Sequence, residues 1–88
     1  MKIKDGFILK KIGGTAIVVA VGKRVKEFGG IGSLNDTAEF LWNNLGNAEN
    51  EEDLADMLCS EYDVTKDKAL DSCKIFLEKL KKAKILDD

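Results

Sequence analysis

Few side chains in this sequence could carry out chemistry, and their types and spacing argue against a catalytic or metal site. The 88 residues include no histidine, which removes the commonest general base and the commonest transition-metal ligand. The two cysteines, Cys59 and Cys73, do not form a CxxC pair and fall at apolar positions of expected helices. We expect them to be buried core residues, with a redox or metal role as the alternative. The sequence therefore predicts no enzyme activity, no cofactor and no metal.

The densest group of carboxylates lies in the stretch EEDLAD, residues 51–56. It follows Asn50, which can begin a helix, and anionic side chains are favoured in the first turn of a helix by its dipole. We therefore expect a solvated helix face here rather than an acid–base or metal site.

A second candidate is the glycine-rich stretch GGIGSLND, in which Gly29, Gly30 and Gly32 directly precede a helix signal. Glycine in an ordered element is destabilising by about 0.5–1 kcal/mol relative to alanine, so this density needs a reason. Neither the GxxxxGK[ST] nor the GxGxxG spacing is present, so phosphate binding is not expected. One reading is that the glycines form only a turn and bulge that leave room for Trp42.

The elements that must position this stretch begin with a hairpin. Residues 7–12 (FILKKI) and 15–21 (TAIVVAV) are rich in apolar and β-branched residues, which favour strands. Gly13-Gly14 between them tolerates the positive φ of a two-residue hairpin turn. We expect a third, short strand over residues 30–34.

Three helices are expected to follow, beginning at Asn35 or Asp36, at Asn50 and at Thr65, which are all good N-caps. Asp36 and Glu39 are expected to form a capping-box-like pair. Ile85-Leu86 should fold back on the core. The apolar positions recur with helical spacing; they are Ala38, Leu41, Trp42 and Leu45, then Leu54, Leu58, Cys59 and Tyr62, then Leu70, Cys73, Phe76, Leu77 and Leu80. Strands followed by helices predict a single α+β domain over residues 1–88, in the order βββααα.

The net charge of −2 is distributed unevenly along the chain. Residues 1–26 hold seven Lys or Arg and one acid, residues 27–63 hold ten acids and no Lys or Arg, and residues 64–88 hold seven Lys and five acids. This pattern either serves solubility or creates a bipolar surface that steers a charged partner. No apolar run approaches the ~20 residues of a membrane span, and no signal-peptide pattern is present. We expect a cytoplasmic protein without membrane association.

The order and spacing of these pieces resemble the PqqD family, named for pyrroloquinoline quinone (PQQ) biosynthesis. The residues that carry the resemblance are Leu34-Asn35, Trp42, the stretch EEDLADML…YDV, Asp71, Phe76-Leu77, Leu80 and Ile85-Leu86. The resemblance implies a winged-helix-like fold with a three-stranded antiparallel sheet followed by three helices. It also implies an accessory peptide-binding protein, a peptide chaperone that recognises the leader segment of a ribosomally synthesised precursor peptide (a RiPP recognition element). Such a protein presents its peptide to a separate modifying enzyme, expected to be a radical SAM protein, for PQQ or another peptide product.

The resemblance further implies that the leader pairs with the edge of the third strand and lies in a groove beside the third helix. It thereby offers a second reading of Gly30 and Gly32, which keep this edge open to the close approach of another backbone. The expected peptide-binding residues are Gly30, Ile31, Gly32, Ser33, Leu34, Lys68, Ala69, Ser72, Ile75, Phe76 and Lys79. Ile31 and Ser33 should point toward the groove, and the two lysines either attract acidic leader residues or are simply solvated. Family members commonly have bulkier residues in the third strand, so the resemblance does not define the side-chain pockets here.

Two other classes of function are compatible with the sequence. A winged-helix nucleic-acid binder would place a helix in the major groove. Residues 51–62 hold five acids and no Lys or Arg, whereas residues 66–84 hold seven Lys and three acids. A scaffold that binds only its partner enzyme would use Phe40, Trp42 or the acidic middle of the chain. We expect no nucleic-acid partner, and a monomer or a weak dimer paired through the third-strand edge.

Overall fold

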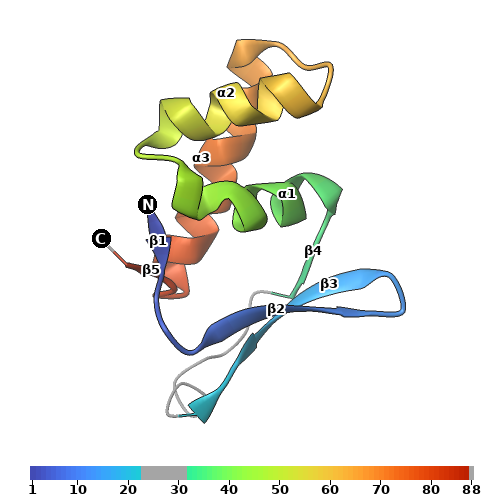
Figure 1. Cartoon of the computed structure of the whole chain (residues 1–88), viewed down its shortest axis with the longest axis vertical. Helices are drawn as coiled ribbons and strands as arrows, with labels where there is room; N and C mark the ends of the chain where they lie inside the picture. Colours follow the sequence, from blue (N-terminus) through green and yellow to red (C-terminus); the bar gives the residue numbers. More distant parts are fainter. Residues whose placement is uncertain (23–31, 88) are drawn as a thin grey trace.

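The computed structural model describes residues 1–22 and 32–87, and its helices lie together beyond one side of a small antiparallel sheet (Figure 1). Strands β2 (Phe7–Ile12), β3 (Thr15–Ala20) and β4 (Ser33–Leu34) form the sheet in the order β2-β3-β4. Gly13 and Gly14 have φ values of 57° and 82°, as a two-residue hairpin turn between β2 and β3 requires. The predicted hairpin and the α+β fold are thus confirmed.

The register of the sheet separates its two faces. Leu34 in β4 lies opposite Ala16 in β3, and both side chains are buried with Val18 on the side of the helices. Ile8 and Ile12 lie on the opposite face, where they are exposed.

Of the predicted third strand over residues 30–34, Ser33 and Leu34 form β4 and pair with β3, whereas Gly32 lies before the strand. Gly32 directly before it has φ 75°, which L-residues with a side chain rarely adopt. A Cβ at Gly32 would meet nothing within 4 Å, so the idea that this glycine makes room for Trp42 is wrong. Gly29, Gly30 and Ile31 lie outside the described residues.

A second, two-stranded sheet joins the ends of the described chain, which the sequence analysis missed. Strand β1 (Lys2–Ile3) pairs antiparallel with β5 (Leu86–Asp87), and Lys4 N donates to Ile85 O at 2.8 Å. Figure 1 shows the two strands side by side near the C-terminal end of α3. Ile85 and Leu86 are both buried, so their predicted return to the core is confirmed.

The helices are α1 (Asp36–Asn44), α2 (Glu51–Glu61) and α3 (Lys66–Lys82), with a 3₁₀ helix (Leu45–Asn47) after α1. The side chains of Asn35, Asn50 and Thr65 accept the N–H groups of the third residue beyond them, as expected for N-caps. The predicted capping-box pair of Asp36 and Glu39 is wrong. Asn35 is the cap of α1, and the Glu39 carboxylate instead pairs with Lys11 Nζ at 3.3 Å.

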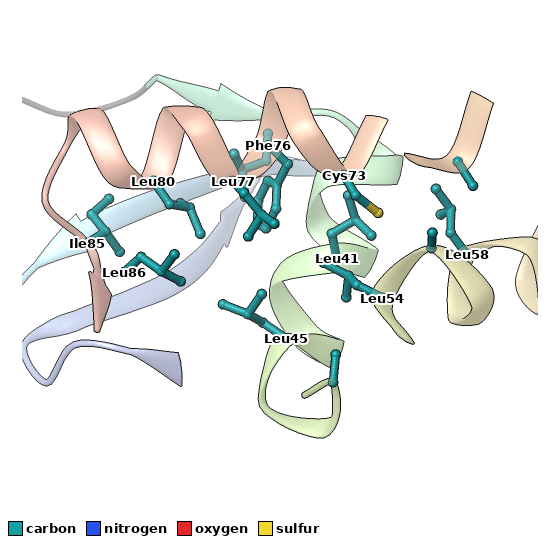
Figure 2. Packing of buried hydrophobic residues seen from close by; sticks show 14 of the residues in the cluster. Leu41, Leu45, Leu54, Leu58, Cys73, Phe76, Leu77, Leu80, Ile85 and Leu86 are labelled. Atoms are coloured by element: carbon teal, nitrogen blue, oxygen red, sulfur yellow. The ribbon is translucent and has the colours of Figure 1, made fainter. Parts of the chain in front are cut away.

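The core lies between the helices and the inner face of the sheet, and Figure 2 shows its packing. It includes Leu41, Leu45, Leu54, Leu58, Cys73, Phe76, Leu77, Leu80, Ile85 and Leu86. The prediction that Tyr62 faces inward is wrong. Since α2 ends at Glu61, Tyr62 leaves the apolar stripe, is 36% exposed, and meets Phe40 edge-on at 5.6 Å between ring centroids.

Candidate functional site

A groove with a cavity volume of about 410 Å³ lies where β4, α1 and α3 meet. This volume is within the range of sites that hold ligands or partner side chains. The residues that line it are Ser33, Leu34, Asn35, Thr37, Ala38, Leu41, Ser72, Ile75, Phe76 and Lys79. One strand and two helices therefore supply its walls.

The floor of the groove is apolar and belongs to the core. Leu34, Leu41 and Phe76 are 7%, 1% and 4% exposed, and they come from β4, α1 and α3 respectively. Figure 2 shows Leu41 and Phe76 within the packed cluster. Because such side chains are held by close packing on several sides, this floor is preformed.

Ile75 forms an apolar part of the rim. It projects from α3 and is 60% exposed, although it lines the same groove as the buried floor residues. A single exposed isoleucine is ordinary on a protein surface. Its position beside a preformed apolar floor makes the groove a larger apolar surface that a partner side chain could cover.

The polar residues of the lining carry a single sign of charge. Ser33, Asn35, Thr37 and Ser72 provide hydroxyl and amide groups. The Asn35 side-chain oxygen already accepts from Ala38 N at 2.8 Å and so fixes the start of α1. In the described part of the chain, Lys79 is the charged residue of the lining and no carboxylate belongs to it. Within residues 1–22 and 32–87, Lys79 forms no ion pair.

Strand β4 borders the groove with an edge that has no strand partner among the described residues. In the part of the chain that the structure describes, β4 pairs only with β3. In an antiparallel ladder, alternate residues point both N–H and C=O away from the partner strand. Either Ser33 or Leu34 therefore directs both groups outward, and such an edge can accept an added strand.

The structure brings six of the predicted binding residues together in the groove: Ser33, Leu34, Ser72, Ile75, Phe76 and Lys79. Gly32 lies directly before β4. Gly30 and Ile31 lie outside the described residues.

Two predicted residues on the N-terminal part of α3 do not line the groove. Lys68 is exposed outside it, and Ala69 is fully buried in the core. Ala69 has no surface for a peptide because this part of α3 packs against α2.

The sequence analysis missed the wall formed by Asn35, the N-cap of α1, and by Thr37, Ala38 and Leu41 of α1. A signal for this wall was present. Asn35 alone separates β4 from α1, so the first turn of α1 must lie beside the strand that leads into it.

The polar groups of the described lining are hydroxyl groups, one amide and one ammonium group. Among the residues that the structure describes, no cluster of His, Cys, Asp or Glu could hold a metal ion. Cys73 lies in the core behind the groove, where burial, and to a lesser extent Glu51 and Cys59, raise the pKa of its thiol from 9.0 to about 11. A neutral, buried thiol is a poor nucleophile, so Cys73 serves the core. No helix in the described part of the chain is long and apolar enough to cross a membrane.

Comparison with known proteins agrees with this architecture. The family model of coenzyme PQQ synthesis protein D (PqqD) matches residues 8–86. One similar solved structure is that of TbiB1 in complex with the TbiA(beta) leader peptide, which is 22% identical in sequence with a TM-score of 0.75. The likeness covers 99% of this chain and 95% of that one and concerns the fold. No curated protein matches the sequence.

Proposed function

The chain belongs to the PqqD family, and from this premise we propose that it binds the leader segment of a ribosomally synthesised precursor peptide. The observation that carries the proposal is the groove itself, in which an apolar floor lies directly beside the open edge of β4. TbiB1, which is similar in fold, binds a leader peptide, and this supports the same class of ligand here.

Strand addition to β4 is the proposed mode of binding. Main-chain hydrogen bonds to a sheet edge supply affinity that depends little on sequence, and pockets for alternate side chains supply selectivity. The edge of β4 offers the main-chain hydrogen bonds, and the groove offers an apolar pocket formed by Leu34, Leu41 and Phe76. An added strand would place every second side chain over this floor.

The protein is proposed to act as a non-catalytic partner of a separate modifying enzyme. A radical SAM protein is the class of enzyme proposed. In the described part of the chain, the lining contains no carboxylate, histidine or thiol that could form an acid–base pair or act as a cysteine nucleophile. Such a surface suits holding a peptide rather than changing it covalently.

The test uses synthetic peptides encoded by short reading frames beside the gene for this chain, titrated calorimetrically into the full-length protein. A leader-binding protein gives saturable heat with one of them, and no binding to any of them contradicts the proposal. Amide hydrogen exchange then examines the mode of binding. Strand addition should slow exchange of whichever N–H of Ser33 or Leu34 points outward.

Leu9 provides the matched control for this exchange measurement, because β2 forms the opposite edge of the same sheet and the register of β2 with β3 directs the Leu9 N–H to its outer side. Its amide should exchange equally fast with and without peptide. Binding that leaves both β4 amides unchanged would refute strand addition while leaving leader binding intact.

A second candidate function, a scaffold that binds its enzyme without any peptide, is favoured by a separate surface. Phe40 and Tyr62 line a shallow hollow of about 300 Å³ with Asp36, Glu39 and Asn43. Exposed aromatic side chains are enriched at interfaces between proteins. If Tyr62→Ala abolished capture of the neighbouring enzyme while peptide binding was absent altogether, the scaffold function would replace the first proposal.

A further inference from the structure

We infer that the leader recognised by this groove contains an apolar residue followed two positions later by Asp or Glu. The inference rests on the proposed function and adds the class of sequence that is bound. The apolar side chain packs on the floor formed by Leu34, Leu41 and Phe76, and the carboxylate pairs with Lys79.

The charge of the groove selects the acidic partner. Lys79 is the charged residue of the lining and has no ion-pair partner in the described part of the chain. Among residues 1–22 and 32–87, no carboxylate lines the groove that could compete for this ammonium group or repel an incoming acid. Lys82 follows one helical turn later and is exposed, so the cationic character extends beyond this end of the groove.

The two-residue spacing in the leader follows from the rise per residue of an α-helix and of a β-strand. Phe76 and Lys79 are three residues apart on α3, which corresponds to about 4.5 Å along the helix axis. Side chains on the same face of a strand recur every two residues, about 6.6–6.8 Å apart. The flexible Lys79 side chain can span the difference between these two distances. An acid four strand residues from the apolar one, about 13 Å away, would lie beyond the reach of Lys79.

The order of the two residues follows from the directions of the elements. In Figure 1, β4 leads from the sheet up to α1, whereas α3 runs the opposite way, down toward β5. Both neighbouring pairs in this sheet are antiparallel, and antiparallel pairing is slightly more stable per residue. A leader antiparallel to β4 therefore runs in the direction of α3, from Ser72 toward Lys79, and its acid comes after its apolar residue.

The experiment selects a displayed library of random peptides against the full-length protein. The wild-type chain should enrich the pattern apolar-x-acidic. The same selection against Lys79→Glu should enrich apolar-x-basic peptides. Lys81→Glu is the matched control, because Lys81 lies in the same last turn of α3, is exposed, and does not line the groove. It should enrich the wild-type pattern.

The Kd of a single enriched peptide then measures how much Lys79 contributes to binding. Its Kd should rise about five- to twentyfold with Lys79→Glu, as expected for losing one ion pair and gaining a repulsion. It should return toward the wild-type value when the acidic residue of the peptide is changed to lysine. Circular dichroism confirms that both variants are folded.

The outcomes separate this inference from its premise. Enriched peptides with an apolar residue but no acidic preference would overturn the inference and leave peptide binding intact. An acid two positions before the apolar residue would refute the stated order. No enrichment at all, with folded protein, would overturn the proposed function and the inference with it.

Discussion

Replacing Ile75 by alanine separates peptide binding from stability in this groove. Ile75 is 60% exposed in the free protein and lines the groove on α3. Complete burial of an isoleucine side chain is favourable by about 1.5–3 kcal/mol. If a bound leader covers the exposed part, Ile75→Ala loses roughly 1–2 kcal/mol of binding free energy, about five- to thirtyfold in Kd.

The same substitution should leave the free protein as stable as before or slightly more stable. Alanine is a better helix former than isoleucine by a few tenths of a kcal/mol, and Ile75 contributes little to the core. Thermal unfolding followed by circular dichroism therefore measures the effect on the fold, and calorimetric titration of a bound leader peptide measures the effect on the groove.

Ile12 provides the matched control for this prediction. It is 57% exposed, belongs to β2, and lies outside the groove. Ile12→Ala should leave the Kd of the peptide unchanged. The reasoning is refuted if Ile75→Ala binds within about twofold of the wild type, or if the two variants lose affinity equally.

Three further predictions concern the fold that supports the groove. Gly32→Ala should lower the free energy of unfolding by about 1–2 kcal/mol, because Gly32 has a positive φ. Gly46→Ala is the control and should not lower it, because Gly46 also lies in open space but has no positive φ. Equal urea midpoints for the two variants would contradict this prediction. Leu54→Ala should cost about 2–5 kcal/mol in the same assay, since the side chain is fully buried, and a loss below about 1 kcal/mol would show that α2 is loosely packed. Burial raises the pKa of Cys73 from 9.0 to about 11, so the folded state keeps a proton that the unfolded thiol loses, and the free energy of unfolding falls as the pH rises through this window. Cys73→Ala should remove that part of the pH dependence, up to about 3 kcal/mol. A slope equal to that of the wild type between pH 9.0 and about 11 would contradict this prediction.

The parts of the fold that local chemistry determines were predictable from the sequence. Gly13-Gly14 between two β-rich runs predicts the hairpin, and Asn50 and Thr65 predict the starts of α2 and α3. In each case the signal consists of neighbouring residues whose backbone preferences agree. The α+β architecture follows from the order of these elements.

Long-range contacts were not predictable in the same way. Strands β1 and β5 are two residues each and lie at opposite ends of the sequence, so neither has a periodic pattern of its own. Ala69 lies at the edge of the apolar stripe of α3, and its complete burial depends on α2 packing against that part of the helix. The α1 wall of the groove likewise depends on the position of the helix beside β4.

The division of the groove into floor and rim bears on how its specificity could change. Leu34, Leu41 and Phe76 form the floor and are also core residues, so substitutions there would lower stability along with binding. Ser72, Ile75 and Lys79 form the rim, and none belongs to the buried core. The pairing of β1 with β5 joins the ends of the described chain, and β4 is held by its pairing with β3. Neither pairing involves a rim residue, so the rim contributes little to the stability of the fold. Because surface substitutions usually change stability by less than about 0.5 kcal/mol, the rim can change to accept a different leader while the floor and the strand edge are retained.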